Sequence, residues 1–294
     1  MTSSCVFCSA RGRFFSSAAG EFVFLLVFSA AAVFSQTVPN QAVKGARDVS
    51  FQAAIDGSRQ HYVLLLPDGF DPKVPHNLLI ALHGHGSDRW QFMEPTRDEA
   101  RAALDTAKKQ QLIYVTPDYR ATTSWMGPKA EADVVQIILL LKKEYNIRKV
   151  FLCGASMGGT GTLIFAVLHP DLLDGIVSMN GTANLLLYDK FQDAIQRSYG
   201  GTKQEIPMEY KKRSAEYWPE ALTMPMAVTL SGKDKTVPPD SVERLTTVLK
   251  NMGRNVKVIY REEEGHKTSY NDAMEALADV IDPADVSKPA PQPQ

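Results

Sequence analysis

The feature that most constrains this fold is a regular alternation of short apolar runs with longer segments of helical periodicity. Strands are predicted at Tyr62–Leu66, Leu78–Leu82, Leu112–Thr116, Lys149–Cys153, Gly175–Met179, Met226–Leu230 and from Val256 onward. Helices are predicted from Asp98, Glu131, Thr160, Ser241 and Tyr270. Strand followed by helix along the chain predicts an α/β fold, with a doubly wound, mostly parallel sheet and helices on both faces. In such sheets, chemistry gathers at the carboxyl ends of the strands.

The first residues of the chain depart from this pattern. Arg11 and Arg13 precede a short apolar run, Phe22–Phe34, which is followed by small residues. This order predicts a secretory signal peptide over residues 1–35, because the run is too short to span a bilayer comfortably. We therefore expect a secreted or periplasmic protein with no stable membrane insertion after cleavage. An uncleaved membrane anchor and a wrongly assigned start codon are the alternatives.

The remaining chain divides into three predicted parts. Residues 36–54 are expected to be a linker, residues 55–282 one catalytic domain, and residues 283–294 a disordered proline-rich tail. Removal of residues 1–35 would take away Cys5 and Cys8 and leave Cys153 alone. The mature chain would then form no internal disulfide. The formal net charge of the full 294-residue chain is −1, which predicts no nucleic-acid partner.

The short segment Gly154-Ala155-Ser156-Met157-Gly158 joins a predicted buried strand to a predicted helix. A G-x-S-x-G sequence in this strand–turn–helix context is typical of a nucleophile elbow. The glycines allow a turn in which larger side chains would collide, and the serine is held in a strained backbone conformation. Ser156 is therefore the candidate nucleophile, and a simple glycine-rich connector is the alternative.

A serine hydroxyl needs a base to accept its proton and an acid to orient that base. Both should follow the serine along the chain, acid first. Asp234 comes directly after a predicted strand and is the candidate acid, whereas its rival Asp240 resembles a helix N-cap. His266 follows the last predicted strand, and it alone of six histidines lies after the acid. It is the candidate base.

The segment "LHGHGSD" follows the strand Leu78–Leu82, where a backbone donor for a negatively charged oxygen is expected. We predict one donor at Met157 N–H, where the helix dipole helps, and another from Gly84, His85 or Gly86, with His85 preferred. His83 is expected to hold this loop by hydrogen bonds. No third ligand accompanies His83 and His85 nearby in the sequence, so we predict no metal. Chemistry through a serine, a histidine and an aspartate needs no organic cofactor either, so we predict none.

Together, "GASMGG", "LHGHG", "SGKDKTVPP" and "EEGHKTSY" resemble the α/β-hydrolase superfamily over roughly residues 55–282. The resemblance implies an α/β-hydrolase fold, with nucleophile, acid and base on Ser156, Asp234 and His266. "PDYRATTSWMG" is similar to secreted feruloyl esterases and polyester depolymerases. "GKDKTVPPDSVERLTTVLKNMGRNV" is similar to the catalytic domain of prolyl oligopeptidases. Those peptidases often carry a large N-terminal propeller, for which only about sixty residues are present before the first predicted strand.

Two segments are candidates for shaping a substrate pocket. Tyr119 and Trp125 follow the strand Leu112–Thr116, although Trp125 could instead pack against the next helix. The long connection 182–223 lies between the sixth and seventh predicted strands, and such an insertion commonly forms a cap. Trp218 in this connection is expected either to face the substrate or only to hold the cap in place by packing.

The sequence therefore predicts an exported serine hydrolase that cleaves carboxylic esters, on a small molecule or a polymer, through an acyl-enzyme intermediate. A prolyl oligopeptidase-like serine peptidase is the alternative. A non-catalytic binding protein on the same scaffold is the rival from another functional class. Nothing in the sequence indicates the oligomeric state or the identity of the substrate.

Overall fold

The computed structural model of this chain describes residues 43–281. The predicted signal peptide with its two cysteines and the proline-rich tail lie outside these residues. Within them, no helix is both long and apolar enough to cross a membrane.

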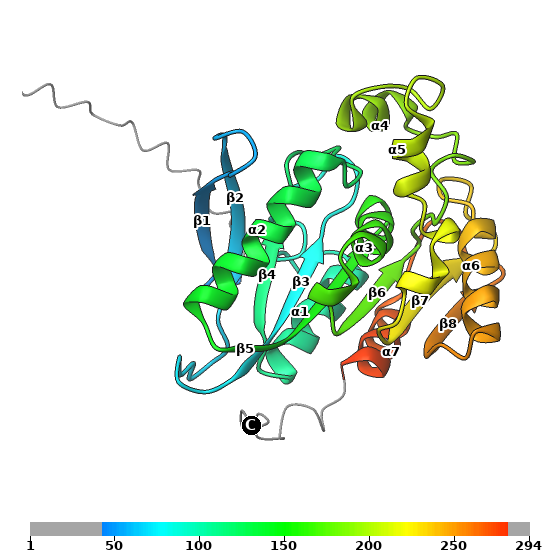
Figure 1. The fold of residues 1–294 in the computed structure, drawn as a ribbon. Helices are drawn as coiled ribbons and strands as arrows, with labels where there is room; N and C mark the ends of the chain where they lie inside the picture. Colours follow the sequence, from blue (N-terminus) through cyan, green and yellow to red (C-terminus); the bar gives the residue numbers. More distant parts are fainter. Residues whose placement is uncertain (1–42, 282–294) are drawn as a thin grey trace, which may run out of the picture. The chain divides into compact units, whose positions relative to one another are not determined.

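The described residues form one eight-stranded sheet in the order β1-β2-β4-β3-β5-β6-β7-β8 (Figure 1). The strands are β1 (Arg47–Gln52), β2 (Arg59–Leu65), β3 (His76–Leu82), β4 (Ile113–Pro117), β5 (Ile147–Ala155), β6 (Gly175–Met179), β7 (Met226–Ser231) and β8 (Val256–Arg261). Strands β3 to β8 are parallel, while β2 is antiparallel to both of its neighbours. The predicted mostly parallel α/β sheet is thus confirmed.

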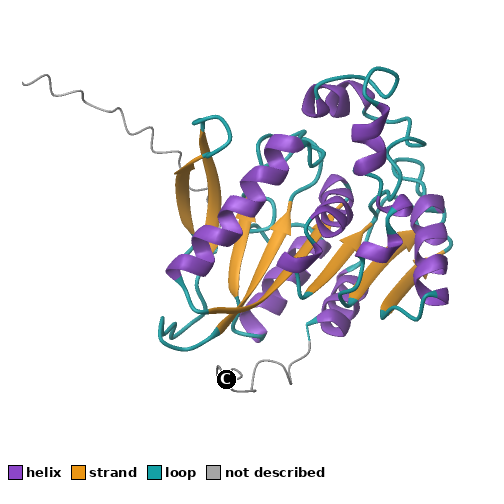
Figure 2. Ribbon diagram, viewed as in Figure 1, coloured by secondary structure: helices purple, strands orange, loops and turns teal. Residues whose placement is uncertain are grey.

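Helices cover both faces of the sheet, as Figure 2 shows. They are α1 (Asp98–Lys109), α2 (Pro128–Glu144), α3 (Met157–Leu168), α6 (Asp240–Asn251) and α7 (Tyr270–Val280). Residues of α2, α3 and α6 share one apolar core, and residues of α1 and α7 share the other. Leu78 and Ile80 of β3 point into the first core and Leu79 into the second. Burial on both faces explains why this strand is apolar at every position from Leu78 to Leu82.

Residues 47–52, which were predicted to be part of a linker, form the edge strand β1. Only Val49 and Phe51 of this strand pack against the core, and both are partly buried. Pairing with β2, rather than an apolar run of its own, therefore determines this strand. A sequence pattern that depends on apolar runs misses such an edge.

The connection between β6 and β7 contains α4 (Gln192–Tyr199) and α5 (Pro207–Lys212), followed by the 3-10 turns η2 (Ala215–Tyr217) and η3 (Pro219–Ala221). Figure 1 shows α4 and α5 on the side of the sheet towards which the parallel strands point. These two short helices lie on either side of Gly200-Gly201. Closure of this insertion over the site as a cap stays a prediction.

Candidate active site

Ser156 lies directly between β5 and α3, with φ 58° and ψ −118°. The helix begins at Met157 rather than at Thr160, so no flexible residue separates it from the serine. A Cβ atom on Gly154 would lie 2.4 Å from the Gly158 carbonyl oxygen, and one on Gly158 would lie 2.1 Å from the Leu82 carbonyl oxygen. Only glycine fits at these two positions, so this is a tight turn that holds one serine in a strained backbone conformation.

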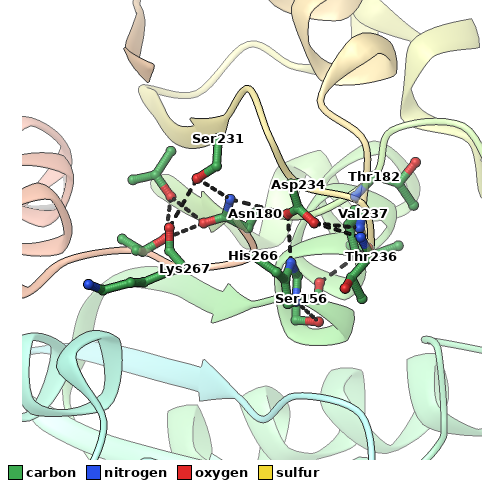
Figure 3. A network of polar contacts seen from close by, with 12 residues as sticks. Ser156, Asn180, Thr182, Ser231, Asp234, Thr236, Val237, His266 and Lys267 are labelled. Carbon is green, nitrogen blue, oxygen red and sulfur yellow. Dashed lines mark hydrogen bonds and ion pairs between the residues drawn. The ribbon is translucent and has the colours of Figure 1, made fainter. Parts of the chain in front are cut away.

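The three candidate catalytic side chains form one chain of hydrogen bonds (Figure 3). His266 Nε2 lies 2.8 Å from Ser156 Oγ, and His266 Nδ1 lies 2.6 Å from Asp234 Oδ2. Asp234 is buried, and its other oxygen accepts the N–H groups of Thr236 at 2.9 Å and Val237 at 2.8 Å. The carboxylate therefore fixes the proton on Nδ1 and leaves Nε2 free to accept the serine proton.

Four backbone N–H groups were predicted to donate hydrogen bonds to a negatively charged oxygen, and two of them already donate to other groups in the structure. Gly84 N–H donates to Gln91 Oε1 at 2.6 Å, and Gly86 N–H donates to the Thr122 carbonyl at 2.8 Å. These two residues are therefore removed from the set of candidate donors. Within residues 43–281, neither His85 N–H nor Met157 N–H has a hydrogen-bond acceptor. Met157 N–H lies at the N-terminus of α3, where the helix dipole favours a nearby negative charge.

Tyr119 and Trp125 hold the loop after β3 rather than line a pocket. Tyr119 is 1% exposed, and its hydroxyl donates to the His83 carbonyl at 2.6 Å. Trp125 is 0% exposed, and its Nε1–H donates to His85 Nδ1 at 3.0 Å. Both residues have positive φ, an uncommon conformation for side chains of this size. The expectation that they contact substrate is therefore corrected, because the loop after β4 folds back over the loop after β3.

Burial lowers the pKa of both histidines of that loop. Burial lowers the pKa of His83, whose Nδ1 lies 2.8 Å from the Gly84 carbonyl oxygen. Burial, together with the nearby charge of Arg197, also lowers the pKa of His85. Since His85 Nδ1 accepts the hydrogen bond from Trp125 Nε1–H, the ring proton of His85 lies on Nε2. Among residues 43–281, no cluster of three histidine, cysteine or acidic side chains is arranged to hold a metal ion.

Trp218 is partly buried, and its Nε1–H donates to the Lys211 carbonyl at 3.0 Å. This bond ties the segment after η2 back to α5. In the described part of the chain, Trp218 makes no hydrogen bond with Ser156 or His266. The structure therefore places it within the insertion, and its contact with substrate stays a prediction.

Two polar residues near the site were not predicted. Gln91 Oε1 accepts the hydrogen bond from Gly84 N–H, and nothing in the sequence around Gln91 indicates this contact. Asn180 follows β6 directly and donates to Ser231 Oγ at 2.9 Å. Its place after a strand was a usable signal, because polar residues at strand ends of a parallel sheet gather at one edge.

Comparison with known proteins adds family and fold relationships. A family model described as the prolyl oligopeptidase family matches residues 103–282. Feruloyl esterase C of Emericella nidulans is 27% identical over 84 residues, which cover 29% of this chain and 30% of that protein. The chain thus aligns with less than a third of this relative.

Two solved structures share most of the fold at low identity. The fluorophosphonate-binding serine hydrolase F of Staphylococcus aureus, with substrate bound, has a TM-score of 0.64 at 16% identity, over 81% of this chain and 98% of that one. The acylaminoacyl peptidase of Pyrococcus horikoshii has a TM-score of 0.61 at 16% identity, over 83% of this chain and 44% of that one.

Proposed function

This chain belongs to the prolyl oligopeptidase family, and we propose that it is a serine hydrolase that cleaves carboxylic esters with Ser156 as the nucleophile. Its α/β-hydrolase fold and its assignment as a serine hydrolase agree with the sequence prediction and are confirmed by the comparisons. The observation that carries the proposal is the chain of hydrogen bonds from Asp234 through His266 to Ser156. Among residues 43–281, the N–H groups of Met157, which directly follows Ser156, and of His85 have no acceptor.

In the proposed reaction, Ser156 Oγ attacks the ester carbonyl carbon while His266 Nε2 takes the hydroxyl proton. Asp234 stabilises the resulting imidazolium through the short bond to Nδ1. The carbonyl oxygen becomes negative and accepts hydrogen bonds from Met157 N–H and His85 N–H. Such preorganised donors contribute about 3 kcal/mol each to transition-state stabilisation.

The tetrahedral intermediate then collapses to an acyl-enzyme. His266 returns its proton to the departing alkoxide, so the alcohol leaves neutral. A water molecule next attacks the acyl carbon, and His266 Nε2 again takes the proton. Release of the carboxylic acid regenerates Ser156. Each proton taken by His266 is returned within the same half-reaction, so no cofactor is required.

The labelling experiment compares three forms of the protein with a fluorophosphonate probe. We expect the unmodified protein to be labelled and Ser156→Ala to remain unlabelled with an unchanged melting temperature. Ser50→Ala, which alters an exposed serine on β1, is the matched control and should label normally. Equal labelling of all three proteins contradicts the assignment of Ser156.

Ester hydrolysis is proposed on the similarity to feruloyl esterase C, whereas the family match also favours a second candidate, a serine peptidase. Turnover of p-nitrophenyl acetate, a feruloyl ester and a proline nitroanilide distinguishes the two. We expect kcat/KM to be highest for an ester. A higher kcat/KM for the nitroanilide would assign the protein as a peptidase.

We also propose that the protein is exported, on the basis of the basic and apolar pattern of residues 11–35. Expression of the full chain in a secreting host, followed by N-terminal sequencing of the product, tests this. Recovery outside the cytoplasm with a new N-terminus near residue 36 supports export, and an intact N-terminus in the cytoplasm contradicts it.

A further inference from the structure

Asn180 is a buried polar residue next to the candidate acid Asp234 and the loop of the candidate base His266. It is the first residue after β6, is 5% exposed and has a φ of 46°. Asparagine tolerates this left-handed backbone region better than most residues, but it is still sparsely populated. Its own N–H donates to the Thr229 carbonyl at 3.0 Å, which fixes the backbone against β7.

The Asn180 amide group links three segments that are far apart in the sequence. Its Nδ2 donates to Ser231 Oγ at 2.9 Å and to Asp234 Oδ2 at 3.5 Å. Its Oδ1 accepts the hydroxyl proton of Thr268, two residues after His266. The amide orientation follows from chemistry, because a carboxylate only accepts hydrogen bonds and so requires the NH₂ group on its side.

The network continues into the loop that carries His266. Ser231 Oγ donates to the Lys267 carbonyl at 3.1 Å, and Thr229 Oγ1 lies 2.7 Å from Thr268 Oγ1. Figure 3 shows Asn180 between Ser231 and Asp234, with Lys267 on the far side. Asn180 therefore contacts both the residue that orients the base and the segment that carries the base.

We propose that Asn180 is a positioning residue that holds Asp234 and the His266 loop in register, and so sets how readily His266 accepts the Ser156 proton. This inference rests on the function proposed above. Among the described residues, the Asn180 side chain makes no hydrogen bond with Ser156, so its amide acts through Asp234 and the His266 loop.

The other charged groups beside this pair in the chain lie at the surface. The basic Lys233, Lys235 and Lys267 and the acidic Glu262, Glu263 and Glu264 are all exposed and therefore screened by solvent. From the insertion, Tyr188 donates its hydroxyl to the Thr236 carbonyl, and burial raises its pKa, so it is neutral. A new charge at position 180 would thus act on the pair largely unopposed.

The test is the pH dependence of the rate at which a fluorophosphonate probe labels Ser156, which requires no knowledge of the substrate. Asn180→Asp keeps the side-chain shape but replaces the donor facing Asp234 with a second acidic group. At pH values where both carboxyl groups are ionised, the added negative charge stabilises protonated His266, so the acid limb of the profile should move to higher pH by about one unit. Asn180→Ala adds no charge and should lower the plateau rate about tenfold.

Asn77→Asp is the matched control, because Asn77 is also buried but lies at the opposite end of β3, where it accepts a bond from Arg148. Its profile should coincide with that of the unmodified protein. If the profiles of both Asn180 variants also coincide with that of the unmodified protein, the positioning role is overturned, whatever the melting temperatures of the variants. Absence of labelling in the unmodified protein refutes the proposed function and, with it, this inference.

Discussion

Gly158 lies where the first turn of α3 crosses the end of β3, and the substitution Gly158→Ala would test whether the turn at Ser156 must be tight. The new Cβ atom would stand 2.1 Å from the Leu82 carbonyl oxygen and 2.8 Å from that of His83. Both atoms are backbone, in the segment that leads into the His85 loop. Neither can rotate away, so the start of α3 must move as a unit.

The size of that movement sets the expected effect. Cβ atoms essentially never approach other heavy atoms closer than 3.0 Å, so α3 must shift by roughly 1 Å. Overpacking costs about 1–3 kcal/mol where side chains adapt, and a backbone collision belongs at the upper end, at about 3 kcal/mol. For a domain of this size, that lowers the melting temperature by about 6–12 °C.

The same shift separates Met157 N–H from His85 N–H by a similar distance. Because a misplacement of about 1 Å lowers catalytic rates by about 10²-fold, the labelling rate at Ser156 should fall by that factor. Labelling is measured below the melting transition, so that the fraction of folded protein does not limit it.

Gly161→Ala is the control in the same helix. A Cβ there meets only side-chain atoms, Leu82 Cδ1 and Met126 Cε, each at 3.3 Å, and both can move. Alanine also favours the helix by up to about 1 kcal/mol over glycine. We expect Gly161→Ala to keep the melting temperature and the labelling rate. A Gly158→Ala protein that melts and labels like the unmodified one would refute the reasoning.

Two further predictions concern the supports of the site. Trp125→Phe removes the donor to His85 Nδ1, so kcat for an ester should fall about tenfold with KM within about twofold, because the ring no longer fixes the donor loop. In a His85→Ala background, Trp125→Phe should lower kcat no further. A loss of kcat in the double variant that equals the two single losses combined argues against the Trp125–His85 hydrogen bond as the cause. Burial raises the pKa of Glu131, but hydrogen bonds from His169 and Arg213 outweigh it and hold the value at about 2. A depressed carboxyl pKa stabilises the fold above its ordinary value of 4.5 and loses that contribution as pH falls towards 2. Glu131→Gln should therefore cost about 3 kcal/mol at pH 7 and much less at pH 3 in urea denaturation, and an equal cost at both pH values contradicts this.

Several elements of the fold could be predicted because their cause is local. The strand β3 is buried on both faces, so it appears as a continuous apolar run. The turn at Ser156 requires glycine at positions 154 and 158, whatever else surrounds it. By contrast, β1 has a weak pattern, since it is an edge strand with only Val49 and Phe51 against the core.

The candidate site was predictable in its order but not in its supporting contacts. Ser156, Asp234 and His266 each follow a strand, and parallel strands bring their carboxyl ends to one edge. Nothing local indicates that Gly84 N–H is occupied, because its acceptor on Gln91 lies in a loop without regular structure. Tyr119 was expected at the pocket surface, yet its hydroxyl is consumed by the His83 carbonyl.

The sequence by itself determined the sheet, the strained turn and the three side chains after strand ends, because periodicity and glycine sterics act over a few residues. Only the tertiary structure decided which backbone N–H groups stay free, why Trp125 is buried and that Asn180 joins the acid to the base. These features depend on contacts between residues 7 to 88 positions apart. Whether two such polar groups meet is decided by how the loops pack, and no local pattern encodes that distance.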